Sequence, residues 1–173
     1  MVTAGRTSSY PEIGLALNIT RYESAGDSID RTLSAAPMTA TTYARRHLVT
    51  KGSFEATFKE LPSEIDPRAV GEIWPPALDR QTKFFTITAT QDNSEYLCVV
   101  PRNGGQVVHA VSSLVQGEML DVPQGTVLVV MGKCEVAGAP HEALDVIVLL
   151  NSATTVIADE AMQMHQFWNS KLR

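Results

Sequence analysis

The chain has 173 residues, of which 44% are hydrophobic and 19% are charged, and this balance is typical of a folded globular protein rather than a disordered one. Its formal net charge of −5 argues against autonomous binding of nucleic acid through phosphate contacts. No stretch reaches the roughly 18 apolar residues that a transmembrane helix needs. The N-terminus has no secretory signal, so we expect an intracellular protein.

Residues 1–40 are rich in Ser, Thr and Ala and show no sustained hydrophobic period, apart from a possible short strand at Leu15, Leu17 and Ile19. We therefore expect an extended N-terminal arm, partly disordered or ordered by a partner. From residue 41 to 155 the pattern predicts a β-domain. Phe54, Ala56 and Phe58 alternate with polar residues, as in a half-buried strand.

Residues 61–80 contain four prolines and predict a long loop inserted into this domain. Alternation over residues 83–90 and an apolar run over 96–100 flank the turn cluster at 91–94, which predicts a hairpin. Residues 126–136 predict a strand interrupted at Gly132, where a bulge or a sharp coil is expected. The last strand is expected over 144–150.

The final segment, 156–173, is expected to be an α-helix. Its large apolar residues fall at helical spacing, and charges of the appropriate sign lie at both ends. Met and Trp side chains are common interface anchors, so this helix is the expected partner interface. The residues that we expect to face the partner are Ile157, Ala161, Met164, Phe167 and Trp168.

Catalytic and metal motifs are absent from the sequence, so we expect no enzyme activity, no metal and no cofactor. The four histidines have no metal-ligand spacing, and the cluster of His141, Glu142 and Asp145 is interpreted as a solvated turn. Cys98 and Cys134 lie in apolar runs and are expected to be buried free thiols.

The distribution of charge separates the predicted β-domain from its flanks. Residues 84–160 carry nine acidic and two basic side chains, so this region repels phosphates. Contacts to nucleic acid would have to come from side chains that flank the first strands. The candidates are Arg45, Arg46, Lys51, Arg80, Lys83 and Phe84.

The predicted strand count and the coil-forming glycines favour a five-stranded OB-like barrel, with a compact β-sandwich as the alternative. From about Thr39 the order of features resembles the small OB-fold subunit of trimeric single-strand-binding complexes, namely the replication protein A small subunit and the small subunit of the CST telomere complex. The resemblance is carried by residues 43–46 leading into a strand, the hairpin 84–100, the run Gly125 to Gly132, and the terminal helix.

This resemblance implies a non-catalytic scaffold subunit that assembles with a larger protein through its C-terminal helix. Single-stranded DNA would be bound weakly or through the complex, and the location would be nuclear. Two alternatives stay open. One is a structural component of a large assembly, such as a virion coat or decoration protein or an accessory subunit of an organelle complex, with a virion or mitochondrial location. The other is a cupin-like small-molecule binder, because Asp121 to Thr126 resembles a cupin turn, although the expected histidine pair is missing.

Overall fold

The chain forms two compact units composed almost entirely of β-strands. In the computed structural model the described residues are 1–32, 45–58, 61–74 and 84–173. The N-terminal unit comprises Met1–Ser9 and Ala16–Gln106, and the C-terminal unit comprises Tyr10–Leu15 and Val107–Arg173. Within the described residues the only helical element is a short 3-10 turn, η1 (Pro11–Ile13), and none forms a helix long and apolar enough to cross a bilayer.

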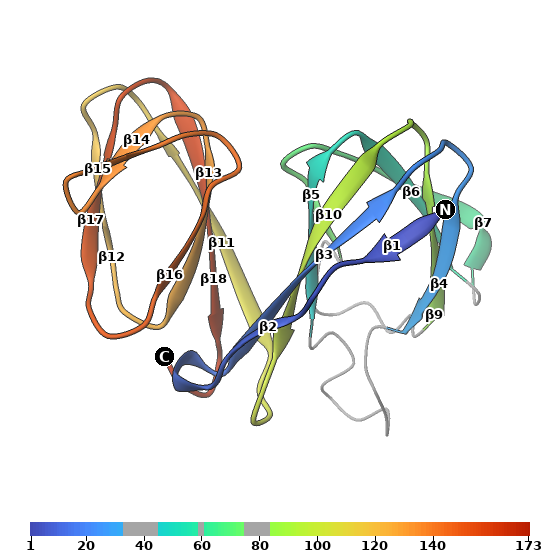
Figure 1. The fold of residues 1–173 in the computed structure, drawn as a ribbon, viewed down its shortest axis with the longest axis horizontal. Coiled ribbons are helices and arrows are strands. Elements are labelled where there is room, and N and C mark those ends of the chain that lie inside the picture. Colours follow the sequence, from blue (N-terminus) through green and yellow to red (C-terminus); the bar gives the residue numbers. More distant parts are fainter. Residues whose placement is uncertain (33–44, 59–60, 75–83) are drawn as a thin grey trace. The chain divides into compact units, whose positions relative to one another are not determined.

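The N-terminal unit is a sandwich of two antiparallel sheets (Figure 1). One sheet has the order β1 (Val2–Ala4), β3 (Leu15–Tyr22), β10 (Ser94–Pro101), β5 (Arg46–Lys51) and β8 (Ile73–Trp74), with β2 (Ser8–Tyr10) paired to β3. The other has the order β4 (Ser28–Thr32), β9 (Phe84–Ala89), β6 (Ser53–Phe58) and β7 (Leu61–Ala69). Both sheets contribute inward-facing residues to one core, which contains Tyr22, Val49, Phe54, Ala56, Ile87, Ala89, Tyr96 and Cys98.

The C-terminal unit is a second sandwich with the same two-sheet design. One sheet has the order β11 (Val107–Leu114), β18 (Met162–Asn169), β13 (Thr126–Met131) and β16 (Val146–Leu149). The other has the order β12 (Met119–Val122), β17 (Thr154–Ala158), β14 (Cys134–Val136) and β15 (Ala139–His141). The strand interruption predicted at Gly132 is confirmed, since this glycine separates β13 from β14 with φ of 146°.

The all-β prediction is confirmed, but the five-stranded closed barrel is wrong, because the strands form separate sheets packed as sandwiches. Residues 1–32, which were expected to be an extended arm, carry strands β1 to β4. β3 lies between β1 and β10, so this segment is part of a sheet. Its polar side chains hid the pattern because β1 and β2 are short and mostly exposed.

The predicted C-terminal helix is also wrong, since residues 154–169 form the strands β17 and β18, which belong to different sheets. β18 lies inside its sheet between β11 and β13. Met162 and Met164 are buried in the sandwich core, whereas His165 and Phe167 are buried on the opposite face of the strand. A strand that is buried on both faces does not alternate between apolar and polar residues, which explains why its apolar residues also fitted a helical spacing.

The proline-rich segment was expected to be a loop, yet its described part contains β7 and β8. β7 carries Pro62 and Pro67 and, among the described strands, pairs only with β6, at the end of its sheet. An edge strand tolerates proline because one side of its backbone needs no ladder hydrogen bond. The predicted hairpin over 84–100 is likewise two strands in different sheets, since β9 pairs with β4 and β6 whereas β10 pairs with β3 and β5.

Candidate ligand-binding site

Two charged side chains face the interior of the N-terminal sandwich. In the antiparallel pair of β6 and β7, Arg68 lies opposite Phe54 and Asp66 lies opposite Ala56. Residues directly opposite each other in such a pair project from the same face of the sheet. Because Phe54 and Ala56 belong to the core, Asp66 and Arg68 project into it as well.

Asp66 and Arg68 form an ion pair within this interior. The Arg68 Nη2 donates to Asp66 Oδ1 at 2.7 Å, and the two side chains are 18% and 13% exposed. The Arg68 Nε–H is buried and makes no hydrogen bond with the described residues. Removing two charges from water is costly, and an apolar pair of similar size is often at least as stable, so stability alone does not account for this pair.

Aromatic side chains pack around the interior. Tyr22, Phe54 and Tyr96 contact one another with ring centroids 5.0 to 5.9 Å apart, in edge-to-face or tilted orientations. The His47 and Tyr96 rings pack edge-to-face, with centroids 5.2 Å apart. His47 lies opposite Cys98 in the pair of β5 and β10, so it shares the core face of that sheet.

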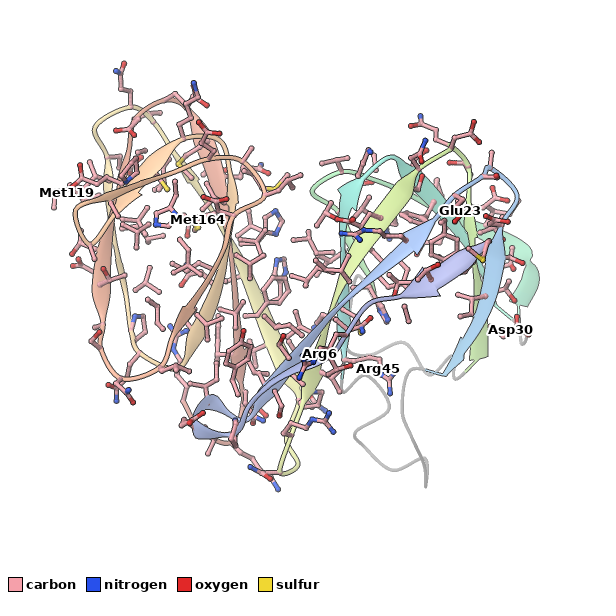
Figure 2. All side chains as sticks on the ribbon, viewed as in Figure 1. Arg6, Glu23, Asp30, Arg45, Met119 and Met164 are labelled. Atoms are coloured by element: carbon pink, nitrogen blue, oxygen red, sulfur yellow. The ribbon has the colours of Figure 1, made fainter. Side chains whose placement is uncertain are left out.

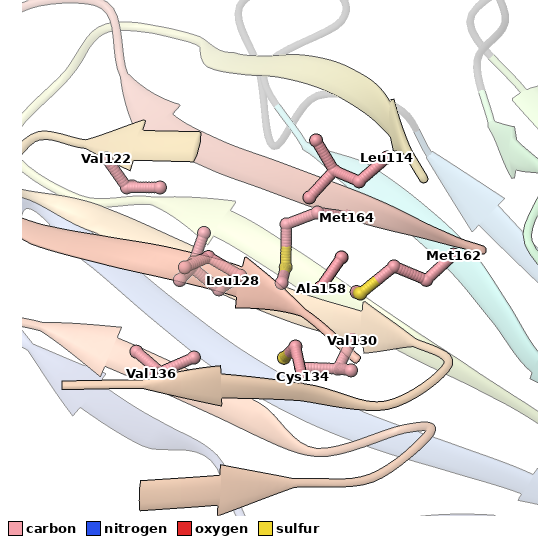
Figure 3. Packing of buried hydrophobic residues seen from close by; sticks show 10 residues of the cluster. Leu114, Val122, Leu128, Val130, Cys134, Val136, Ala158, Met162 and Met164 are labelled. Atoms are coloured by element: carbon pink, nitrogen blue, oxygen red, sulfur yellow. The ribbon is translucent and has the colours of Figure 1, made fainter. Parts of the chain in front are cut away.

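The interior of the C-terminal sandwich is apolar by contrast. Its buried residues are Leu114, Val122, Leu128, Val130, Cys134, Val136, Val156, Ala158, Met162 and Met164. Figure 3 shows Met162, Met164 and Cys134 meeting between the strands. Burial raises the pKa of the Cys134 thiol, and the negative charges of Asp159 and Asp145 act in the same direction. This thiol is therefore a packing group, and the interior offers no charged ligand contact.

A second polar cluster, the pair of His109 and His165, lies on the opposite face of β11 and β18 from this core. His109 Nε2 and His165 Nδ1 are 2.9 Å apart, and the rings stack with centroids 5.1 Å apart. Burial lowers the pKa of His165 to about 4, so this ring is neutral at pH 7. Two imidazoles alone supply too few ligands for a metal site. Among the described residues, no group of three or more His, Cys, Asp or Glu side chains could hold a metal ion.

The cluster of His141, Glu142 and Asp145 forms a turn, as the sequence interpretation had it. Asp145 Oδ2 accepts hydrogen bonds from the Glu142 backbone N–H and lies 3.1 Å from His141 Nδ1. Both contacts lower the pKa of Asp145, and the hydrogen bond from the Glu142 backbone has the larger effect. The turn that resembles a cupin turn lines an open depression of about 380 Å³, in which Thr155 Oγ1 donates to Asp121 Oδ1 at 2.7 Å.

The residues expected at a partner interface do not share one face. Ile157 is half-buried on β17, and Ala161 is exposed in the turn before β18. Met164 points into the sandwich core (Figure 2), whereas Phe167 is buried on the other face of the same strand. Trp168 is half-buried, with the Arg173 guanidinium 4.1 Å from its ring centroid.

The described residues expected to contact nucleic acid differ in their exposure. Arg45 is half-buried, Lys51 is exposed, and Arg46 is only 6% exposed, with a pKa lowered by burial. Arg80, Lys83 and the side chain of Phe84 lie outside the described residues. Asp66 and Arg68 were missed because proline spacing assigned their segment to a loop. The alternation of exposed Ile65 and Pro67 with half-buried Asp66 and Arg68 becomes meaningful only when β6 is known to pair there.

Comparison with known proteins assigns the architecture. No family model matches the chain, and no curated protein does. A cupin 2 conserved barrel domain protein from Leptotrichia buccalis matches 98% of this chain and 89% of its own, with a TM-score of 0.64 and 17% identity. The fold is cupin-like. HutD from Pseudomonas fluorescens (TM-score 0.57, 10% identity) and the bacterial pirin YhhW from Escherichia coli in complex with nickel(II) (TM-score 0.55, 8% identity) each match 98% of this chain and 99% of their own.

These matches correct the expected family. The similar structures are cupin-like proteins and not OB-fold subunits of single-strand-binding complexes. The predicted function of a DNA-binding scaffold, with its telomere and replication associations, is therefore wrong. The cupin-like small-molecule binder, which was the second alternative from the sequence, agrees with the fold. The glycine-bounded run from Gly125 to Gly132 was misleading because apolar strands between glycine turns occur in many β-folds.

Proposed function

We propose that this chain is a cupin-like protein that binds a small molecule in the interior of its N-terminal unit without a metal ion. The observation that carries the proposal is the Asp66–Arg68 ion pair, which lies inside one sandwich while the interior of the other is apolar. Fixed charges inside an apolar, aromatic shell are the usual means by which a pocket orients a small ligand.

The metal-free part of the proposal rests on the donor atoms available. One structurally similar protein, the pirin YhhW, was solved with nickel(II). Nickel and related ions are held by imidazole, carboxylate or thiolate ligands that converge on one point. In the portion of the chain that the structure describes, three such groups do not converge. The described residues therefore do not fit a cupin metal centre.

Binding, rather than catalysis, is the proposed activity. The Asp66–Arg68 pair supplies hydrogen-bond donors, acceptors and opposite charges in a fixed geometry, and such groups can recognise a polar ligand. The surrounding Tyr22, Phe54 and Tyr96 rings add apolar contact surface and exclude water.

The proposal is tested by thermal-shift screening of the full chain, treated with a chelator and checked for metal content, against a library of small polar metabolites. At least one compound is expected to raise the melting temperature in a saturable way, because a ligand that binds only the native state stabilises it. Stoichiometric nickel, zinc or iron that survives chelation would contradict the metal-free proposal. A library in which no compound stabilises the protein would contradict the binding function.

A further inference from the structure

The C-terminal unit has an open depression at the end of the strand pair formed by β12 and β17 (Figure 1). Its volume is about 380 Å³, and its lining residues are Asp121, Val122, Pro123, Ala153, Thr154 and Thr155. Pockets for small molecules measure about 300–1,000 Å³, so this space is large enough for a small ligand.

The depression presents one carboxylate in a defined orientation. Asp121 lies opposite Thr155 in the strand pair, and Thr155 Oγ1 donates to Asp121 Oδ1 at 2.7 Å. Within the described residues, no donor or cation contacts the second oxygen, Asp121 Oδ2. The Thr155 hydroxyl therefore orients the carboxylate and leaves one of its oxygens open to a ligand.

We infer that this depression binds a small primary amine in its ammonium form. The ammonium donates to the Asp121 carboxylate, and the short hydrocarbon chain lies against Pro123 and Ala153, which are exposed. An ammonium carries three N–H donors, and its hydrogen bonds to a carboxylate are charge-assisted. The inference concerns a site on the C-terminal unit, so it goes beyond the proposed function and does not depend on it.

The charge of the C-terminal unit favours a cation over an anion. Residues 107–173 carry seven acidic and three basic side chains. The three basic residues, Lys133, Lys171 and Arg173, do not line the depression. An acidic surface raises the local concentration of cations, whereas an anion in the depression would be repelled by Asp121.

The lining favours an organic cation over a metal ion. Calcium takes about six to eight oxygen ligands, and magnesium requires an octahedral set. Asp121 is the one carboxylate in the lining, and no group of three or more His, Cys, Asp or Glu side chains in the described part of the chain could hold a metal ion. The apolar surface of Pro123 and Ala153 contributes nothing to a metal, but it withdraws an alkyl chain from water.

The test titrates butylamine into the full chain at low and constant ionic strength, with binding followed through the backbone amide signals in NMR. Butylamine is protonated at pH 7, like a lysine side chain. Saturable shifts are expected at Asp121 and Thr155. Three comparison probes should each bind at least about threefold more weakly, as for the loss of an exposed ion pair: butanol lacks the charge, tetramethylammonium lacks the N–H donors, and calcium lacks the alkyl chain.

Variants locate the contact. Asp121→Asn keeps the shape of the side chain and removes its charge, so it should weaken butylamine binding by at least about threefold. The matched control is Glu135→Gln, because Glu135 is an exposed acid on β14 in the same sheet and does not line the depression. Butylamine affinity should be nearly unchanged in this control.

Several results would overturn the inference. These are the absence of saturable shifts at Asp121 and Thr155, equal or tighter binding of any comparison probe, and full butylamine affinity in Asp121→Asn. An equal loss in Glu135→Gln would also overturn it, since the general charge of the unit would then explain the effect.

A peptide analogue separates a free amine from a lysine side chain of a protein. Nα-acetyl-lysine N-methylamide carries the same ammonium on a peptide backbone and should bind no more tightly than butylamine. Tighter binding would assign the site to a protein partner and overturn the inference of a small amine. None of these results affects the binding function proposed for the N-terminal unit, which has its own screen.

Discussion

Acidification from pH 7 to pH 4 should weaken the C-terminal unit through His165. This ring has a pKa of about 4 in the folded chain because it is buried, whereas an unfolded histidine titrates near 6.5. The unfolded state therefore takes up a proton first, and stability is present above pH 6.5 and lost as the pH falls toward 4. The pKa difference of about 2.5 units corresponds to a loss of about 3 kcal/mol by pH 4.

The loss is measurable by urea unfolding followed by tryptophan fluorescence. The chain has two tryptophans, so a Trp74→Phe background leaves Trp168, on the same strand as His165, as the reporter. His165→Gln in this background should remove most of the pH-dependent loss between pH 6.5 and 4, although the variant starts from a different stability at pH 7. Asp145 does not complicate this window, because its lowered pKa places its own effect at lower pH.

His141→Gln is the matched control, since His141 lies in a surface turn with Asp145, and it should leave most of the stability loss between pH 6.5 and 4 in place. An unaltered pH dependence in His165→Gln, or a loss well below about 1 kcal/mol in the parent chain, would refute the argument that burial holds His165 neutral.

Three further predictions concern the C-terminal sandwich. In the same urea assay, Gly132→Ala should destabilise the unit by about 2 kcal/mol or more, because the added Cβ would lie 2.5 Å from the Met162 Cβ. In the control Gly117→Ala the added Cβ meets open space, so this variant should cost only the strain of its positive φ, about 1 kcal/mol. Met164→Ala should cost about 2–5 kcal/mol because its side chain fills the core, and Met119→Ala, which is 63% exposed and points away from the core in Figure 2, should cost less than about 0.5 kcal/mol in thermal unfolding. Removal of residues 162–173 should unfold the unit by deleting the central strand β18, and a native-like circular dichroism spectrum with cooperative melting would contradict the strand assignment.

Local patterns predicted individual strands better than their arrangement. The alternation at Phe54 and Ala56 and the break at Gly132 appear in the structure because each depends on neighbouring residues only. The turn over 91–94 was expected to close a hairpin, but turn residues do not specify which sheet the next strand joins. That choice depends on pairing with β3 and β5, which are distant in sequence from β10.

The candidate site depends on such distant pairing. Asp66 and Arg68 are two ordinary polar residues in a proline-rich segment until β7 pairs with β6 and turns them toward Phe54. The prediction for the terminal strand was wrong for a different reason. Burial of Met164 on one face and Phe167 on the other removes the alternation that identifies a strand. The prediction that no metal site exists concerned spacing alone and stays a prediction until metal content is measured.

The central claim, that a small molecule binds inside the N-terminal unit without metal, is tested most directly by fluorine NMR of chelator-treated protein labelled with fluorotyrosine. Tyr22 and Tyr96 lie in the N-terminal core, and Tyr10 belongs to the C-terminal unit and serves as an internal reference. The signals are assigned with Tyr→Phe variants. We expect saturable shifts of the Tyr22 and Tyr96 resonances on addition of a stabilising library compound, with Tyr10 unchanged. Saturable binding that shifts Tyr10 and leaves Tyr22 and Tyr96 in place would contradict the claim.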